Sequence, residues 1–205
     1  LSKEQTSADA NDALFLVLQH ATLSSQLKYM PLLKEAVADK KAKASDYALL
    51  LDRTNMYQGK LQVYGSQVNF DEKGGIHVFP ILDEPDVNKR RKAIGLPSMQ
   101  EYLKLFDQNV IYKLPKTDRY KSKIVIKGSV NDKDTNQPLA NVAIYAANDQ
   151  LLGVSDSSGF FMVLIDKKDG NKKIVLRKNN YDPFEFNLSD TTKQVVEINL
   201  VLLKK

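Results

Sequence analysis

The chain has 205 residues, no cysteine, and 42% apolar residues. This length exceeds the ~100–150 residues of an ordinary domain, and the globular composition excludes collagen-like, coiled-coil and wholly disordered chains. The missing cysteines exclude disulfide bridges, thiolate zinc sites and cysteine nucleophiles. Apolar runs such as Ala13–Leu18 and Ala48–Leu51 are far shorter than the ~20 residues of a membrane-spanning helix, so we expect no transmembrane segment.

The net charge of +5 is unevenly distributed along the chain. Residues 1–115 carry 15 basic and 14 acidic residues, whereas residues 116–205 carry 15 basic and 11 acidic residues. The densest basic run, Lys89–Lys92, surrounds a helix rather than lining one of its faces. Nucleic-acid binders need a clustered basic stripe, so we expect no nucleic-acid partner.

The first half of the chain shows mainly helical periodicity, with apolar residues at three- and four-residue spacing. The predicted helices run from Asp9 or Asn11 to His20, from Ser24 or Ser25 to Asp39, and over Ser45–Tyr57, Asp86–Ile94 and Ser98–Phe106. Pro31 offers an alternative start for the second helix, because proline suits a first turn. Ser98 and Glu101 have the spacing of a capping box. A small β-hairpin, Leu61–Phe70 with Ile76–Ile81, interrupts the helices.

The last part of the chain changes to a two-residue alternation. Seven short strands separated by turn clusters, one of them at residues 168–171, predict a β-sandwich. The sequence therefore predicts an α+β protein: a mainly helical domain with a hairpin at residues 1–113, a linker at 114–122, and a β-sandwich at 123–205.

Three blocks in the second half have a familiar order and spacing: Gly128–Asp132, Pro138–Val142 and Gly153–Phe161. On these blocks the C-terminal half resembles the carboxypeptidase regulatory-like domain, a transthyretin-like sandwich. Asn180 stands where that family usually has glycine, and asparagine tolerates a positive φ better than most residues. The resemblance implies a non-catalytic accessory module of exported bacterial proteins.

The first half carries another set of short motifs: Gln19–Ala21, Asp52-Arg53, Gln62–Gln67 and Val87–Arg91, with Pro80 and Gly95-Leu96. On these motifs it resembles an uncharacterised bacterial family of helical domains. No activity is attached to that family, so this resemblance implies no mechanism.

Polar residues at helix ends form the candidate site, and they are His20, Asp52, Arg53, Gln62, Tyr64, Gln67 and Arg90. Three interpretations fit them. In a structural network, Asp52 and Arg90 form a buried ion pair. In a ligand-binding cleft, Arg90 holds an anion. In a catalytic site, His20 acts as acid or base, with its tautomer fixed by Asp52. No individual catalytic residue is assigned.

Metal and cofactor signals are weak. The segment Asp132-x-Asp134-x-Asn136 imitates the start of a calcium loop, but it lacks the glycine and the glutamate that such loops require, and we interpret it as a β-turn. We therefore expect no metal site and no cofactor.

The predicted function is a non-catalytic accessory or binding module for a protein, peptide or glycan partner at the bacterial envelope. The chain begins with Leu1 rather than methionine, which is consistent with a removed export signal. We accordingly expect an exported protein, periplasmic or associated with the outer membrane. The alternative is an enzyme, possibly hydrolytic, with its site in the helical domain.

Overall fold

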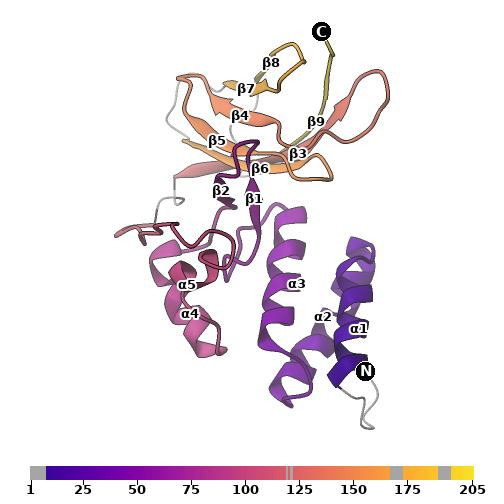
Figure 1. Cartoon of the computed structure of the whole chain (residues 1–205), viewed down its shortest axis with the longest axis vertical. Helices are drawn as coiled ribbons and strands as arrows, with labels where there is room; N and C mark the ends of the chain where they lie inside the picture. The colour runs from indigo at the N-terminus through magenta and orange to yellow at the C-terminus, as the bar shows by residue number, and fades with distance from the viewer. Residues whose placement is uncertain (1–7, 119, 121, 167–172, 189–194) are drawn as a thin grey trace. The chain divides into compact units, whose positions relative to one another are not determined.

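A computed structural model describes residues 8–118, 120, 122–166, 173–188 and 195–205. The chain forms two compact units, shown in Figure 1. The helical unit consists of Leu1–Gln67 with Pro85–Leu114, and the β unit consists of Val68–Glu84 with Pro115–Lys205. The hairpin, which its sequence position places among the helices, belongs to the β unit.

The helices of the helical unit lie where the apolar periodicity predicts them. They are α1 (Ala8–Gln19), α2 (Leu23–Ala38), α3 (Ala44–Tyr57), α4 (Val87–Ala93) and α5 (Met99–Leu103), and a 3₁₀ turn, η1 (Glu84–Asp86), precedes α4. Buried apolar residues come from α2, α3, α4 and α5, so each of these helices contributes to the core.

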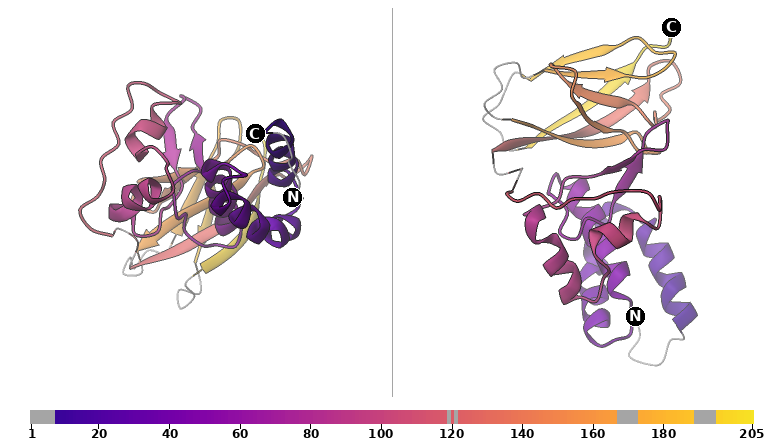
Figure 2. Two further views of the ribbon diagram at one scale, coloured as in Figure 1. Left: turned by 90° about the horizontal axis from the view of Figure 1, so that it is seen from below. Right: turned by 60° about the vertical axis from the view of Figure 1, so that its left-hand side comes forward.

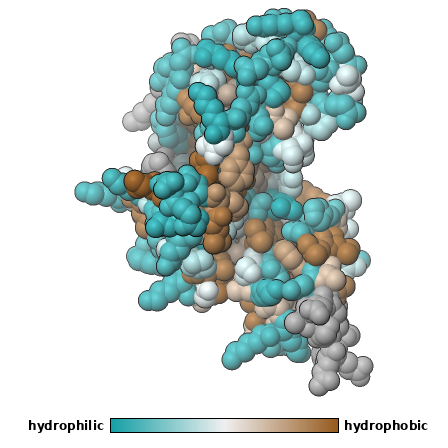
Figure 3. Space-filling view, viewed as in Figure 1, coloured by the Kyte–Doolittle hydropathy of each residue, from teal (hydrophilic) through white to brown (hydrophobic). Residues whose placement is uncertain are grey.

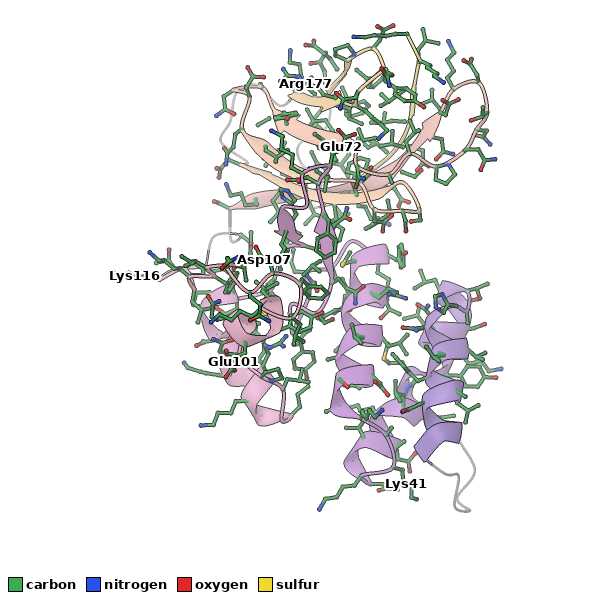
Figure 4. The ribbon with its side chains drawn as sticks, viewed as in Figure 1. Lys41, Glu72, Glu101, Asp107, Lys116 and Arg177 are labelled. Carbon is green, nitrogen blue, oxygen red and sulfur yellow. The ribbon has the colours of Figure 1, made fainter. Side chains whose placement is uncertain are left out.

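Three helix starts test the predicted caps. The capping box of α5 is confirmed, because Ser98 accepts from the Glu101 N–H while Glu101 accepts from the Ser98 N–H (Figure 4 labels Glu101). The predicted start of α2 at Ser24 or Ser25 is late by one or two residues, since the helix begins at Leu23 and its N-cap Thr22 accepts from the Ser25 N–H. The Ser45 cap of α3 is wrong as well, because the helix begins one residue earlier, after Lys43.

Pro31 lies inside α2 rather than at its start. Proline removes one helical hydrogen bond, yet the side chain is exposed and residues on both sides of it stay helical. The alternative start at Pro31 is therefore wrong. The packing of Gln26, Leu33 and Ala36 holds the two halves of α2 in one helix.

The predicted strand Leu61–Phe70 is mostly a loop. Only Val68–Phe70 forms a strand, β1, which pairs antiparallel with β2 (Ile76–Val78). In the loop at residues 61–67, the backbone N–H groups of Val63, Tyr64 and Ser66 instead donate to the side chain of Asp52. The Asp52 carboxylate therefore accepts hydrogen bonds that a neighbouring strand would accept in a sheet. The alternation of apolar and polar residues does not show which acceptor a backbone N–H group finds.

The β unit contains two further sheets. In the described part of the chain these hold seven strands: β3 (Lys123–Asp132), β4 (Ala143–Ala146), β5 (Leu151–Val154), β6 (Phe160–Asp166), β7 (Lys173–Arg177), β8 (Phe184–Asn187) and β9 (Val195–Leu202). One sheet has the order β6-β3-β9 and the other β5-β4-β7-β8 (Figure 2). The predicted seven-stranded sandwich is confirmed, while the predicted turn at 168–171 lies outside the described residues.

An apolar core lies between these two sheets. Alternate residues of the strands point into it, as in β3 with Ile124, Ile126 and Val130, and β4 and β7 supply Ile144 and Leu176 from the other sheet. These five side chains are completely buried. The alternation that predicts each strand thus also identifies its inward face.

Two positions in the β unit demand particular residues. Gly128 of β3 pairs with Ile198 of the parallel strand β9, and a Cβ on Gly128 would lie 1.7 Å from the Ile198 carbonyl oxygen. Asn180 adopts a φ of 66° in the turn before Tyr181. Asparagine therefore fills the left-handed position where the related domains carry glycine, as the sequence predicts.

Surface hydrophobic residues of the helical unit are visible as brown patches in Figure 3. On α1, Leu14, Leu16 and Val17 are exposed by 45%, 54% and 72%. No helix among the described residues is long and apolar enough to cross a membrane.

Candidate functional site

Asp52 is the centre of the predicted polar set. It lies on α3 and its side chain is completely buried. Its Oδ1 accepts the Val63 N–H at 2.7 Å, and its Oδ2 accepts the N–H and the hydroxyl of Ser66 at 2.9 and 2.8 Å. The Tyr64 N–H lies between both oxygens. A carboxylate has about four acceptor positions, so these contacts use its capacity.

The environment of Asp52 is that of a structural anchor. Burial raises the pKa of this carboxyl group, and the hydrogen bonds from Ser66, Tyr64 and Val63 oppose that shift. Because the oxygens are occupied by the 63–66 loop, they are not available to orient a histidine or to activate a water molecule.

Gln62 and Gln67 close the same loop. Gln62 is completely buried; its Nε2 donates to the Gln67 carbonyl, and its Oε1 accepts the Gln67 N–H at 2.7 Å. The Gln67 side chain in turn donates to the Leu49 carbonyl on α3 and accepts from Arg53 Nε at 3.3 Å. Five of the predicted residues, with Tyr64 contributing its backbone, are thus joined in one network: Asp52, Arg53, Gln62, Tyr64 and Gln67.

Two neighbouring arginines of α4 also bind this loop. Arg90 Nε donates to the Val63 carbonyl at 2.8 Å, and Arg91 Nη1 donates to the Tyr64 carbonyl at 2.7 Å. Arg91 is the more buried of the two, with 2% of its surface exposed, and its guanidinium lies 4.7 Å from the ring centre of Tyr102. Burial lowers the pKa of Arg91.

The side chain of Tyr64 is half-buried, and burial raises the pKa of its hydroxyl, while the nearby Arg90 lowers it. Arg90 contacts the Gln62–Gln67 segment through the main-chain carbonyl of Val63.

His20 lies elsewhere, at an open depression of about 490 Å³. It is exposed in the turn after α1, and the depression is also lined by Gln26, Arg53 and Tyr57. Arg53 Nη1 donates to the Gln19 carbonyl at 2.9 Å, which fixes the guanidinium at the end of α1. Arg53 therefore belongs both to the Asp52 network and to the depression that holds His20.

Gln26 has an unpaired acceptor beside this depression. Its Nε2 donates to the carbonyls of Gln19 and Ala21, while its buried Oε1 has no hydrogen-bond partner among the described residues. A buried acceptor without a partner is costly, so a donor from a water molecule or a ligand would stabilise this end of α2.

Sequence reasoning missed Ser66, Gln26 and Arg91. For Arg91 a signal existed, because it lies four residues after Val87 and the two share the buried face of α4. The three adjacent cations Arg90, Arg91 and Lys92 hid that spacing. For Gln26 a signal existed too, because it shares a helical face with Met30 and Leu33, four and seven residues later, but its polar side chain hid that spacing.

Metal ligation finds no support within the described ranges, because they contain no group of three or more His, Cys, Asp or Glu side chains placed to hold an ion. The segment that imitates a calcium loop is a turn. Asp132 accepts the N–H groups of Asp134 and Thr135 and the hydroxyls of Thr135 and Tyr181.

Comparison with known families identifies both halves. Residues 3–115 match a family of unknown function, DUF6624. The chain belongs to the DUF6624 family. Residues 126–205 match the CarboxypepD_reg-like domain, as the sequence blocks around Gly128 and Gly153 indicate. No curated protein sequence matches this DUF6624 chain.

Solved structures share part of the fold. A type II cohesin–X-dockerin complex from Acetivibrio cellulolyticus has 19% identity and a TM-score of 0.29, with 38% of this chain and 56% of that chain covered. A putative membrane-associated protein of unknown function from Bacteroides fragilis has 18% identity and a TM-score of 0.31, with 40% and 28% covered. The Bacillus cereus major pilin BcpA has 14% identity and a TM-score of 0.30, with 41% and 31% covered. The match therefore spans less than two thirds of each of these chains.

Proposed function

We propose that this DUF6624 chain is a non-catalytic accessory or binding protein of the bacterial envelope, exported to the periplasm or the outer membrane. Its partner is a protein, a peptide or a glycan. The observation that carries the proposal is that the acceptor positions of the Asp52 carboxylate are filled by hydrogen bonds from the chain itself. The buried carboxylate of the predicted set binds the 63–66 loop instead of a reacting group.

The depression at His20 is the binding site that this proposal favours in the helical unit. It combines an exposed imidazole, the guanidinium of Arg53 and the phenol of Tyr57. Arg53 is fixed by the Gln19 carbonyl and by Gln67, so a ligand would meet a pre-positioned donor. Gln26 also lines the depression, and its buried Oε1 has no hydrogen-bond partner among the described residues.

The alternative function, a hydrolytic enzyme in the helical unit, has less support. His20 is accessible to a substrate, but none of the described side chains lining its depression carries a carboxylate. A histidine base normally needs a partner that orients its ring. The proposal of a binding function therefore takes precedence.

A ligand screen tests the binding proposal. Purified protein is screened by thermal shift against peptides, glycans and small anions, and each hit is titrated against His20→Ala and Arg53→Lys. We expect both variants to weaken binding by about tenfold, the effect of losing one charge-assisted contact. Lys34→Ala, an exposed change on α2, is the control and should bind as the parent protein does.

Two results would contradict the proposal. Hits whose affinity is unchanged in both variants would remove the depression as the binding site. Turnover of an ester, amide or glycoside substrate that disappears in His20→Ala would favour the enzyme instead.

Localisation is tested separately by cell fractionation, with the protein expected in the periplasm or the outer membrane.

A further inference from the structure

A second depression, of about 480 Å³, lies within the β unit. Its lining includes Ala143, Tyr145 and Leu151 on the four-stranded sheet and the turn between β1 and β2. Glu72 of that turn and Arg177 of β7 both line it and are labelled in Figure 4. A volume of this size falls in the range of about 300–1,000 Å³ that ligand sites occupy.

The hairpin is tied to the sandwich on one side of this depression. Asn69 Nδ2 donates to the Val154 carbonyl of β5 at 3.1 Å. Glu72 accepts from Lys178 Nζ at 3.4 Å and from Asn179 Nδ2 at 2.7 Å. The wall formed by residues 71–73 is therefore held in place by contacts at both the strand and the turn.

The two acidic groups of the lining are already bound. Asp71 Oδ1 accepts the N–H groups of Lys73 and Gly75, and its Oδ2 lies 2.9 Å from His77 Nε2. These contacts, with that to His77 the largest, lower the pKa of Asp71 to about 2. Both oxygens of Glu72 are occupied by the contacts to Lys178 and Asn179.

The basic groups of the lining outnumber the acidic ones. They are Lys73, Arg177, Lys178 and Lys205, against Asp71 and Glu72. Arg177 lies 4.7 Å above the ring of Tyr145 and donates to Asp149 at 2.6 Å, so its planar guanidinium is fixed over the floor. The side chains of Lys73 and Lys205 are exposed at the rim.

We propose that this depression binds an acidic peptide segment. Carboxylates would be bound by Lys73, Lys205 and the guanidinium of Arg177, and the alternate apolar side chains of an extended peptide would contact Ala143 and Leu151. β5 is the edge strand of its sheet, and edge strands of this kind pair with extended peptides.

The same contacts disfavour a saccharide. Sugar hydroxyls donate hydrogen bonds to carboxylates, and Asp71 and Glu72 already accept three and two of the about four hydrogen bonds that each carboxylate can take. Sugar rings also stack on open aromatic faces, whereas Arg177 covers one face of Tyr145. The inference deepens the proposed binding function, because it adds a peptide site in the β unit that does not depend on His20.

Binding is measured by fluorescence anisotropy with the full chain and a labelled short peptide of alternating Glu and Val, and the matched Gln–Val peptide serves as the uncharged control. The Glu peptide should bind and should weaken with added salt, because the rim charges are exposed. Lys73→Gln should reduce its affinity by about tenfold. Arg177→Lys should weaken it less than Arg177→Gln, since lysine keeps the charge and loses the planar fork.

Lys133→Gln is the matched control, because Lys133 is an exposed lysine of the β unit outside the lining. Equal losses of affinity for the Glu peptide in Lys133→Gln and Lys73→Gln would overturn the assigned site. The site would also be overturned if the Gln peptide bound as tightly as the Glu peptide, or if the Glu peptide did not bind at all. A uronic-acid oligosaccharide that binds more tightly and is lost in Lys73→Gln would assign the depression to saccharides and overturn the peptide. If the Glu peptide does not bind while the affinity of other ligands is still reduced by His20→Ala, the peptide site in the β unit is wrong and the proposed binding function stands.

Discussion

Each of the two units of this chain is stabilised internally by a different kind of interaction. Among the described residues of the β unit, fifteen buried apolar side chains, most of them on strands of the two sheets, form one core. In the helical unit, buried polar side chains of Asp52, Gln62 and Arg91 bind the backbone of the 62–67 loop. An apolar core tolerates small rearrangements, whereas a polar network costs free energy as soon as one member is left without its partner. The comparison therefore predicts that substitutions of single buried polar residues in the helical unit cause the largest losses in the free energy of unfolding.

The largest effect should come from Asp52→Asn. The amide offers donors where three backbone N–H groups and the Ser66 hydroxyl need acceptors. We expect a loss of about 3–5 kcal/mol in the free energy of unfolding of the helical unit, the effect of breaking a buried network. The measurement is urea unfolding followed by far-UV circular dichroism, because the chain contains no tryptophan.

Asp46→Asn is the matched control on the same helix. Burial already raises the pKa of Asp46, and within the described chain its side chain accepts only from the neighbouring Ser45 hydroxyl. A change below about 1 kcal/mol is expected. Equal losses in the two variants would contradict the special position of Asp52.

The β unit should be most sensitive to Gly128→Ala. The new methyl group would overlap the Ile198 carbonyl, so β3 and β9 must separate. We expect a loss of about 3 kcal/mol in the free energy of unfolding, which is at the upper end of the usual cost of overpacking a core. Gly153→Ala is the comparison, because its Cβ would meet only a methyl group of Val163 at 3.1 Å. If Gly153→Ala proved the more damaging, the close approach of β3 and β9 would be refuted.

A smaller effect is expected at Asn180. Its φ of 66° costs most L-residues about 1 kcal/mol, so Asn180→Ala should destabilise the β unit by roughly that amount and Asn180→Gly should not. Thermal unfolding of the three proteins measures the difference. A more stable alanine variant would show that the turn does not require this conformation.

The pH dependence of the β unit follows from Asp132. Hydrogen bonds from Thr135 and Tyr181 lower its folded pKa to about 2, below the ordinary 3.8. Its stabilising contribution is therefore complete above about pH 5 and is lost as the pH falls from about 4 to 2. The difference between the urea midpoints of the parent protein and Asp132→Asn should be constant above about pH 5 and should narrow as the pH falls from about 4 to 2. A constant difference over that range would contradict the lowered pKa.

The same contrast explains what the sequence could predict. Alternation in β3 and β9 reports burial on one face of a strand, so the sandwich and its inward residues follow directly. The helices follow from their spacing, and Ser98 with Glu101 marks the start of α5. Asp52 and the Gln62–Gln67 segment were identified as related, but their connection depends on which backbone N–H groups meet the carboxylate. That pairing is set by tertiary packing, and because of it residues 61–67 of the predicted strand Leu61–Phe70 form a loop.

The arginines show the same limit. Arg90 and Arg91 both bind the loop, and only the helical phase shared with Val87 distinguishes the more buried one. The depression at His20 depends on the end of α1 meeting α3, which no local pattern describes. Local periodicity thus predicts the elements, while the sites arise where elements distant in sequence meet.

Hydrogen exchange of the Val63, Tyr64 and Ser66 amides tests the central claim most directly, because these N–H groups bind Asp52. If Asp52 is a structural anchor, the three amides are protected in the parent protein, and they lose protection in Asp52→Asn while amides of β3 and β6 keep theirs. Rapid exchange in the parent protein, or unchanged protection in Asp52→Asn, would contradict the account and leave the carboxylate free for another role.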